Sequence, residues 1–109
     1  MTDRQTIVTL AVKGAYTSKP RPWVVLQSDL FRATDSVILC AFTHVLIAGA
    51  DLLRIDVAPS TENGLMMPSQ LQAEKVVTVR RTDLGARIGR LEDAPMRKLE
   101  AALRDIIGL

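Results

Sequence analysis

An arginine between two prolines is the first residue of this chain whose position suggests chemistry. Pro20 and Pro22 restrict the backbone on both sides of Arg21, and a segment of strand-forming residues, 23–26, follows at once. A guanidinium keeps its charge at any working pH and offers a fork of donors, so Arg21 is a candidate for binding an anion, phosphate above all. The alternative is an arginine that is solvated or paired with a nearby carboxylate.

Length and composition limit the kind of protein that can position this arginine. The chain has 109 residues, which is enough for one domain, and its 48% hydrophobic but only 4% aromatic residues predict an aliphatic core. A net charge of +2 permits nucleic-acid binding without requiring it. There is no apolar run long enough for a membrane span, so we expect a cytoplasmic protein that does not bind membranes. The single Cys40 is expected to be a small buried hydrophobe.

Patterns of apolar residues predict six or seven short strands followed by one helix. Residues 92–95 offer acidic capping and an early proline for the start of this helix. Apolar residues then recur at helical spacing from Met96, and Gly108 is the stop. This apolar stripe is expected to cover one end of the fold. The sequence therefore predicts a mainly β (α+β) fold, a small β-barrel or coiled sheet closed by a helix. The expected strands are residues 6–12, 21–27, 36–43, 53–57, 70–74 with 76–80 as one or two strands, and 87–91.

Short motifs in this order resemble the PemK/MazF family of type II toxin endoribonucleases, or mRNA interferases. Residues 18–29 look like the family's second strand, and residues 37–43 look like its central strand, which ends in a threonine. The resemblance covers almost the whole chain. It implies a single toxin domain over residues 1–109, with an SH3-like β-barrel and a C-terminal helix. Further motifs in family order are residues 52–55, 62–65, 68–70, 76–81 and 88–91.

The resemblance also implies a function. It indicates a homodimer that cuts single-stranded RNA at short sequences without a metal or other cofactor, and that a cognate antitoxin silences. It places the family's second-strand arginine on Arg21 and the threonine that closes the third strand on Thr43. The predicted RNA contacts are Lys19, Trp23, Gln27 and Ser28. Trp23 could stack on a base beside a bound phosphate, although packing explains it equally well.

The chain departs from the family pattern at three places. Gln5 and Thr6 stand where many members have Gly-Asp, so the N-terminal turn is expected to differ. Gln72 stands where some members have an arginine, while Glu74 keeps the acid of that strand. Trp23 occupies a position that is usually small.

Metal-free RNA cleavage needs a base for the 2′-hydroxyl, an acid for the leaving 5′-oxygen, and positive charge against the phosphorane. We assign Arg21 to charge stabilisation and Thr43 to a hydrogen bond with the same phosphate. The base stays open between two residues. His44 carries an imidazole, the side chain that most often transfers protons in catalysis, but strand alternation turns it away from Thr43 unless the strand ends there. Glu74 would need a pKa raised by burial, and a surface ion pair is its alternative.

Two other functions stay open. One is a non-enzymatic topoisomerase poison of the CcdB type, although the chain end, residues 106–109, has no aromatic residue. The other is a degenerate family member that binds the antitoxin without cleaving RNA. The glutamine at position 72 keeps that alternative open.

Overall fold

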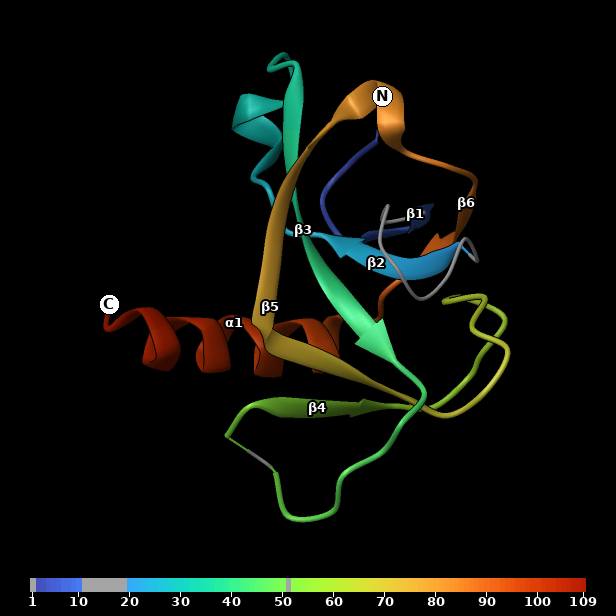
Figure 1. The fold of residues 1–109 in the computed structure, drawn as a ribbon, viewed down its shortest axis with the longest axis vertical. Coiled ribbons are helices and arrows are strands. Elements are labelled where there is room, and N and C mark those ends of the chain that lie inside the picture. Colours follow the sequence, from blue (N-terminus) through green and yellow to red (C-terminus); the bar gives the residue numbers. More distant parts are fainter. Residues whose placement is uncertain (1, 11–19, 51) are drawn as a thin grey trace, which may run out of the picture.

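The fold is a curled antiparallel sheet with one helix (Figure 1). The computed structural model describes residues 2–10, 20–50 and 52–109. Within them the strands run in the order β4-β5-β3-β2-β1-β6, and the sheet curls into a half-barrel with β4 and β6 at its edges. The prediction of a mainly β fold with a barrel-like sheet and a C-terminal helix is confirmed. The elements are β1 Thr6–Leu10, β2 Arg21–Val25, β3 Ser36–Thr43, β4 Arg54–Val57, β5 Ser69–Arg80, β6 Arg87–Arg90 and α1 Asp93–Ile107.

Two short 3-10 turns connect strands of this sheet. The first, Asp29–Phe31, lies where the chain reverses between β2 and β3, and the second, Arg81–Asp83, lies between β5 and β6. The last two residues of the first predicted strand, 11 and 12, lie outside the described residues. None of the helices in the described part of the chain is long and apolar enough to span a membrane.

The sheet buries side chains on both of its faces. One face packs against α1 and carries Val24 and Phe42, while the other carries Trp23 and Leu39. β3 contributes to both clusters, which explains why its sequence is apolar almost without interruption. The predicted bounds of this strand, residues 36–43, are confirmed, although Ile38 is 37% exposed.

β5 is one long strand that joins the two segments predicted at 70–74 and 76–80. Its first part pairs with both β3 and β4, whereas its second part pairs with β3 alone. The register with β3 shifts between Cys40 and Ala41, which is the signature of a β-bulge. Bulges bend a strand and increase its twist, and this one lies where β5 turns toward β4 (Figure 1).

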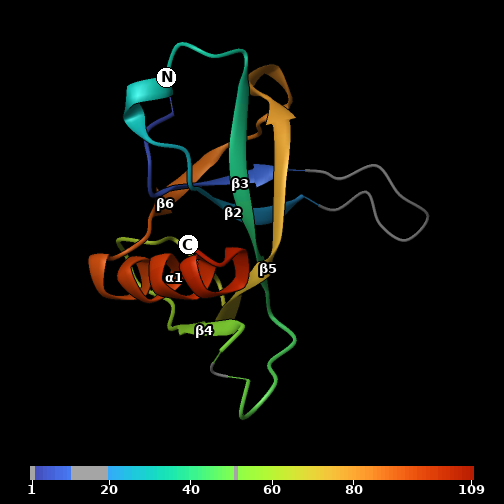
Figure 2. The same ribbon diagram turned by 90° about the vertical axis from the view of Figure 1, so that its left-hand side faces the viewer.

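Helix α1 lies across the inner side of the sheet and contacts β4 and β5 (Figure 2). It ends as predicted, because Gly108 adopts φ 80° and its N–H bonds to the carbonyl of Arg104. The predicted apolar stripe covers the core only along its first part. Met96 and Leu99 are buried, but Ile107 is 62% exposed, because the last turn extends beyond the sheet.

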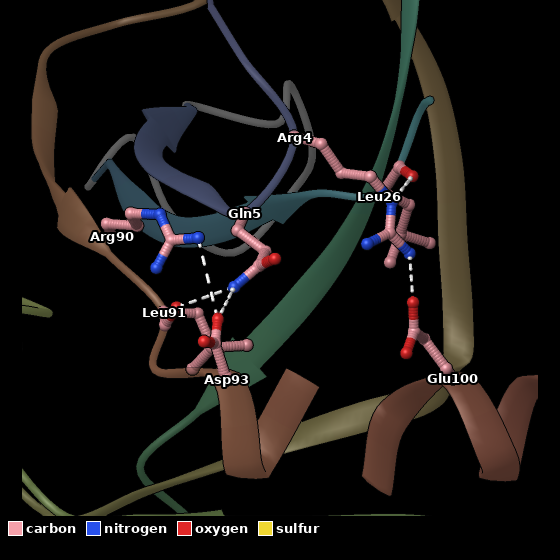
Figure 3. Close-up of polar contacts among 7 residues, drawn as sticks. All are labelled: Arg4, Gln5, Leu26, Arg90, Leu91, Asp93 and Glu100. Carbon is pink, nitrogen blue, oxygen red and sulfur yellow. Dashed lines mark hydrogen bonds and ion pairs between the residues drawn. The ribbon is translucent and has the colours of Figure 1, made fainter. Parts of the chain in front are cut away.

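The N-terminal segment is tied to α1 through side chains (Figure 3). Gln5 adopts φ 73°, the left-handed conformation in which glycine is usually found. Its Nε2 donates to the carbonyl of Leu91 at 3.0 Å and to Oδ1 of Asp93 at 3.1 Å. Arg4 forms an ion pair with Glu100 at 2.8 Å. The turn therefore keeps a glycine-like backbone without glycine, and side-chain bonds hold it.

Candidate active site

Arg21 and Thr43 stand at the same end of two neighbouring strands. Arg21 is the first residue of β2 and Thr43 is the last residue of β3, as the sequence predicted. The two strands are antiparallel, with Trp23 opposite Ala41. Continuing this register by two residues brings Arg21 level with Thr43. The ends of two strands thus place a guanidinium and a hydroxyl side by side.

A cavity of about 310 Å³ lies at these strand ends, and Arg21, Thr43 and His44 all line it. Its volume falls in the range of small-ligand sites. The walls come from the ends of β2 and β3, from β1, from the loop that precedes β5, and from β6. The other lining residues are Thr9, Pro20, Pro22, Phe42, Gly64, Leu65, Met66, Met67, Ser69 and Ile88.

The three polar side chains are available for contact with a ligand. Arg21 is exposed, and no carboxylate of the described residues lies within ion-pair distance of it. Thr43 is half-buried, and its Oγ1 accepts a hydrogen bond from the N–H of Val45 at 3.1 Å. The hydroxyl proton of Thr43 is then free to be donated. His44 is exposed and lines the cavity. Because β3 ends at Thr43, strand alternation does not turn the side chain of His44 away from Thr43.

Asn63 fixes the loop that forms one wall of the cavity. Its side chain is fully buried, and Oδ1 accepts from the N–H groups of Ser60 at 3.0 Å and Leu65 at 2.9 Å. Its Nδ2 donates to the carbonyl of Ala58 at 2.8 Å. Gly64 follows with φ 70°, and a Cβ there would overlap the carbonyl of Ile88.

A glutamate at the start of α1 completes this wall. The carboxylate of Glu92 accepts hydrogen bonds from Ser60 at 2.7 Å and from Asn63 at 3.1 Å. Burial alone would raise the pKa of Glu92, but the hydrogen bonds from Ser60, its own backbone and Asn63 outweigh burial and lower it. Sequence reasoning missed Asn63 and Glu92 as residues that shape the site. The Asn-Gly pair at a turn was the available signal.

Trp23 is buried and does not line the cavity. Its side chain is 7% exposed and belongs to the apolar cluster that contains Val8, Leu39 and Ala41. Packing was the alternative to base stacking, and packing is what the structure shows for this ring.

Gln27 and Ser28 lie apart from Arg21. They line a different cavity of about 460 Å³, together with Leu26, Phe31 and Ile38. Gln27 donates to the carbonyl of Phe31 at 2.8 Å, and Oγ of Ser28 accepts from the N–H of Leu30 at 3.2 Å. The strand expected over residues 21–27 is shorter in the structure, because β2 ends at Val25, so Gln27 does not belong to the strand that carries Arg21. Lys19, the fourth predicted RNA contact, lies outside the described residues.

Glu74 forms an ion pair and does not line the cavity. Its Oε1 lies 3.5 Å from Nε of Arg54 on β4. Such an ion pair was the alternative to a role for Glu74 as the general base. Arg54 is also the register partner of Gln72, so an arginine stands next to the position where the expected one is missing. Within residues 2–10, 20–50 and 52–109, no group of three or more histidine, cysteine, aspartate or glutamate side chains is arranged to hold a metal ion.

Comparison with known proteins adds to this geometry. Residues 3–107 match the family model described as PemK-like, MazF-like toxin of type II toxin-antitoxin system. A protein of Mycolicibacterium smegmatis named probable endoribonuclease MazF is 42% identical over 106 residues, which are 97% of this chain and 96% of that protein.

Solved structures share the fold. The Mycobacterium tuberculosis toxin MazF-mt6 superposes with a TM-score of 0.78 at 23% identity, over 95% of this chain and 97% of that one. A mycobacterial endoribonuclease in complex with its cognate antitoxin gives a TM-score of 0.75 at 20% identity, over 99% and 94% of the two chains. The family match over nearly all residues and the 42% identical relative lead to one conclusion: this chain belongs to the PemK-like, MazF-like toxins of type II toxin–antitoxin systems.

Proposed function

We propose that this protein is a sequence-specific endoribonuclease, an mRNA interferase that cuts single-stranded RNA without a metal and thereby inhibits translation. The observation that carries the proposal is the convergence of Arg21, Thr43 and His44 on one cavity. The relative from M. smegmatis that is 42% identical bears the name probable endoribonuclease MazF, which supports the same activity.

The cavity suggests a role for each of the three residues. The 2′-oxygen of the substrate attacks the adjacent phosphorus, the bond to the 5′-oxygen breaks, and this oxygen takes up a proton from water. The products are a 2′,3′-cyclic phosphate and a free 5′-hydroxyl. Arg21 stabilises the charge that builds up on the phosphorane, and the Thr43 hydroxyl donates to a phosphate oxygen. His44 takes the proton of the 2′-hydroxyl, because imidazole is the side chain suited to proton transfer near neutral pH.

The proposal also includes assembly. We infer that residues 1–109 act as a single toxin domain, that two copies form a homodimer in the cytoplasm, and that a cognate antitoxin neutralises them. A structural neighbour was solved in complex with its cognate antitoxin, which supports the last point. The mild positive charge of +2 suits an acidic antitoxin segment and an RNA strand.

The test is cleavage of a long single-stranded RNA in the presence of EDTA, followed by mapping of the new 5′ ends. Wild-type protein is expected to give discrete cuts, and Arg21→Ala is expected to slow them by roughly 100- to 1000-fold. Arg80→Ala is the matched control, because Arg80 is an exposed arginine paired with Asp83 and does not line the cavity. This control is expected to cut like the wild type.

Three results would contradict the proposal. Intact RNA with wild-type protein that still binds an antitoxin would indicate a member without catalytic activity, and intact RNA together with a stalled topoisomerase would indicate a poison of the CcdB type. Equal loss of activity in Arg21→Ala and Arg80→Ala would show that general positive charge, and not this cavity, drives cleavage.

A further inference from the structure

A buried glutamine lies next to the candidate active site without lining its cavity. Gln70 is 5% exposed and stands on β5 with Thr43 opposite it on β3 and Asp56 opposite it on β4. A polar side chain is costly to bury unless its donors and acceptors are satisfied. The bonds that this side chain makes therefore indicate what it does.

The amide of Gln70 bonds to both backbone groups of a single residue, Ile47. Its Oε1 accepts from the Ile47 N–H at 3.1 Å, and its Nε2 donates to the Ile47 carbonyl at 3.1 Å. Two further partners fix which end of the amide is which. Nε2 also donates to Oδ1 of Asp56 at 2.8 Å, while Oε1 lies 3.4 Å from Nη1 of Arg54. Asp56 can only accept and Arg54 can only donate, so the amide has one consistent orientation.

The segment that Gln70 holds is the one that carries His44. Residues 44–50 leave the sheet after Thr43, and their apolar side chains do little to anchor them, because Val45 and Leu46 are 64% and 52% exposed. Hydrogen bonds anchor this segment instead. Oγ1 of Thr43 holds the N–H of Val45, and Gln70 holds Ile47, so His44 stands just before two anchored residues.

We propose that Gln70 is a positioning residue for catalysis, which fixes the segment 44–47 and thereby the place of His44 relative to Thr43 and Arg21. The inference rests on the proposed function, since it assigns His44 a part in the reaction. A displacement of about 1 Å at a catalytic group can cost on the order of 100-fold in rate. We expect loss of the Gln70 bonds to lower kcat and to leave KM nearly unchanged.

The first variant is Gln70→Glu, which keeps the shape of the side chain but cannot donate from an ionised carboxylate. In this variant an oxygen atom replaces Nε2 of Gln70. The contacts with the Ile47 carbonyl and with the Asp56 carboxylate then change from hydrogen bonds to repulsion between oxygen atoms. We expect kcat to fall by roughly 10- to 100-fold. We also expect the Ile47 amide to exchange its hydrogen faster, while amides in the β2–β3 pairing keep their protection.

A second variant separates positioning from simple loss of stability. In Gln70→Glu with Asp56→Asn, the new asparagine can donate to the new glutamate, so the contact between β4 and β5 returns. The Ile47 carbonyl still faces an oxygen. We expect thermal stability to recover toward the wild type while kcat stays low. Recovery of both together would overturn the inference, because stability alone would then explain the first variant.

A double-mutant cycle with His44→Gln tests the link to the histidine. If Gln70 acts by placing His44, adding Gln70→Glu to His44→Gln slows cleavage little further. A full additional loss would overturn the inference. The outcomes also distinguish the two proposals. If the wild type cuts RNA and Gln70→Glu cuts equally well, only this inference fails. If the wild type leaves RNA intact, the proposed function fails and this inference falls with it.

Discussion

At the scale of single residues, the positions of Arg21 and Thr43 could be predicted because each depends on the end of a strand. Prolines on both sides of Arg21 set the start of β2, and the apolar run of β3 stops at Thr43. The placement of Gln27 could not be predicted. The end of β2 at Val25 depends on how far this strand pairs with β3, and the sequence does not show that.

The roles of residues whose hydrogen-bond partners lie far away in the sequence could not be predicted. Gln70 is 23 positions from Ile47, and Asn63 is 29 positions from Glu92. Their residue types suit many surroundings, and only the curled sheet brings these partners together. The sequence shows polar residues in a strand and in a turn, but it does not show which backbone groups need them.

A prediction at the residue scale concerns the thiol of Cys40. The side chain is fully buried in β3, and its Sγ lies 3.2 Å from the carbonyl of Gln72. Burial, assisted by the charge of Glu74, raises the pKa of Cys40 to about 12. Because the thiolate is the reactive form, we expect native protein to react with a thiol reagent far more slowly than protein in guanidinium, on the order of 1,000-fold.

The measurement is the release of chromophore from a disulfide reagent at mildly alkaline pH. Cys40→Ala serves as the blank, since Cys40 is the single cysteine of the chain. Rapid labelling of the native protein would show that the pairing of β3 with β5 opens often, and it would contradict the burial seen here.

At the scale of elements, periodicity predicted which segments form strands and helix, but not how they end. The end of the helix at Gly108 could be predicted, because glycine is the residue type that commonly ends a helix. The exposure of Ile107 could not be predicted, because it depends on the width of the sheet beneath α1. The two segments predicted within β5 form one strand, because a bulge absorbs the irregularity between them without ending the pairing.

A prediction at this scale concerns the turn before β1. Gln5 holds φ 73°, which costs a residue with a Cβ about 1 kcal/mol or more, and two side-chain hydrogen bonds to Leu91 and Asp93 offset that cost. Gln5→Ala loses the bonds and keeps the strain, whereas Gln5→Gly loses the bonds and relieves the strain. We therefore expect the glycine variant to be about 1 kcal/mol more stable than the alanine variant.

Urea denaturation of the two variants and the wild type measures this difference directly. At an ordinary position inside a strand or helix alanine is the more stable choice, so the reversed order is specific to a left-handed backbone. Alanine more stable than glycine at position 5 would mean that this turn does not hold the positive φ in solution.

At the scale of the whole molecule, side chains distant in sequence join the helix to the wall of the cavity. Glu92, just before α1, accepts from Ser60 and Asn63, and Gly64, which follows Asn63, lines the cavity. At the same helix end, Asp93 accepts from Gln5. The hydrogen bond from Gln5, with the charge of Arg90, lowers the pKa of Asp93. The start of α1 is therefore a junction between the N-terminal turn and the candidate active site.

This junction predicts how the protein responds to acid. The pKa of Glu92 is lowered in the folded state, so the ionised carboxylate is more stable there than in the unfolded chain. Its contribution to stability is fully present above the usual pKa of a glutamate and is lost as the pH falls through the lowered folded value. We expect the thermal midpoint of the wild type to drop more between about pH 6 and about pH 3 than that of Glu92→Gln, which has no proton to gain there.

Calorimetry or circular dichroism across this pH range measures the difference between the two proteins. Glu62→Gln is the matched control, because Glu62 is an exposed glutamate on the loop that carries Ser60 and Asn63, and the midpoint of this variant is expected to follow that of the wild type. Parallel pH curves for the wild type and Glu92→Gln would show that the ionised carboxylate does not stabilise the cavity wall, because hydrogen bonds from Ser60 and Asn63 that favour the ionised form must weaken on protonation.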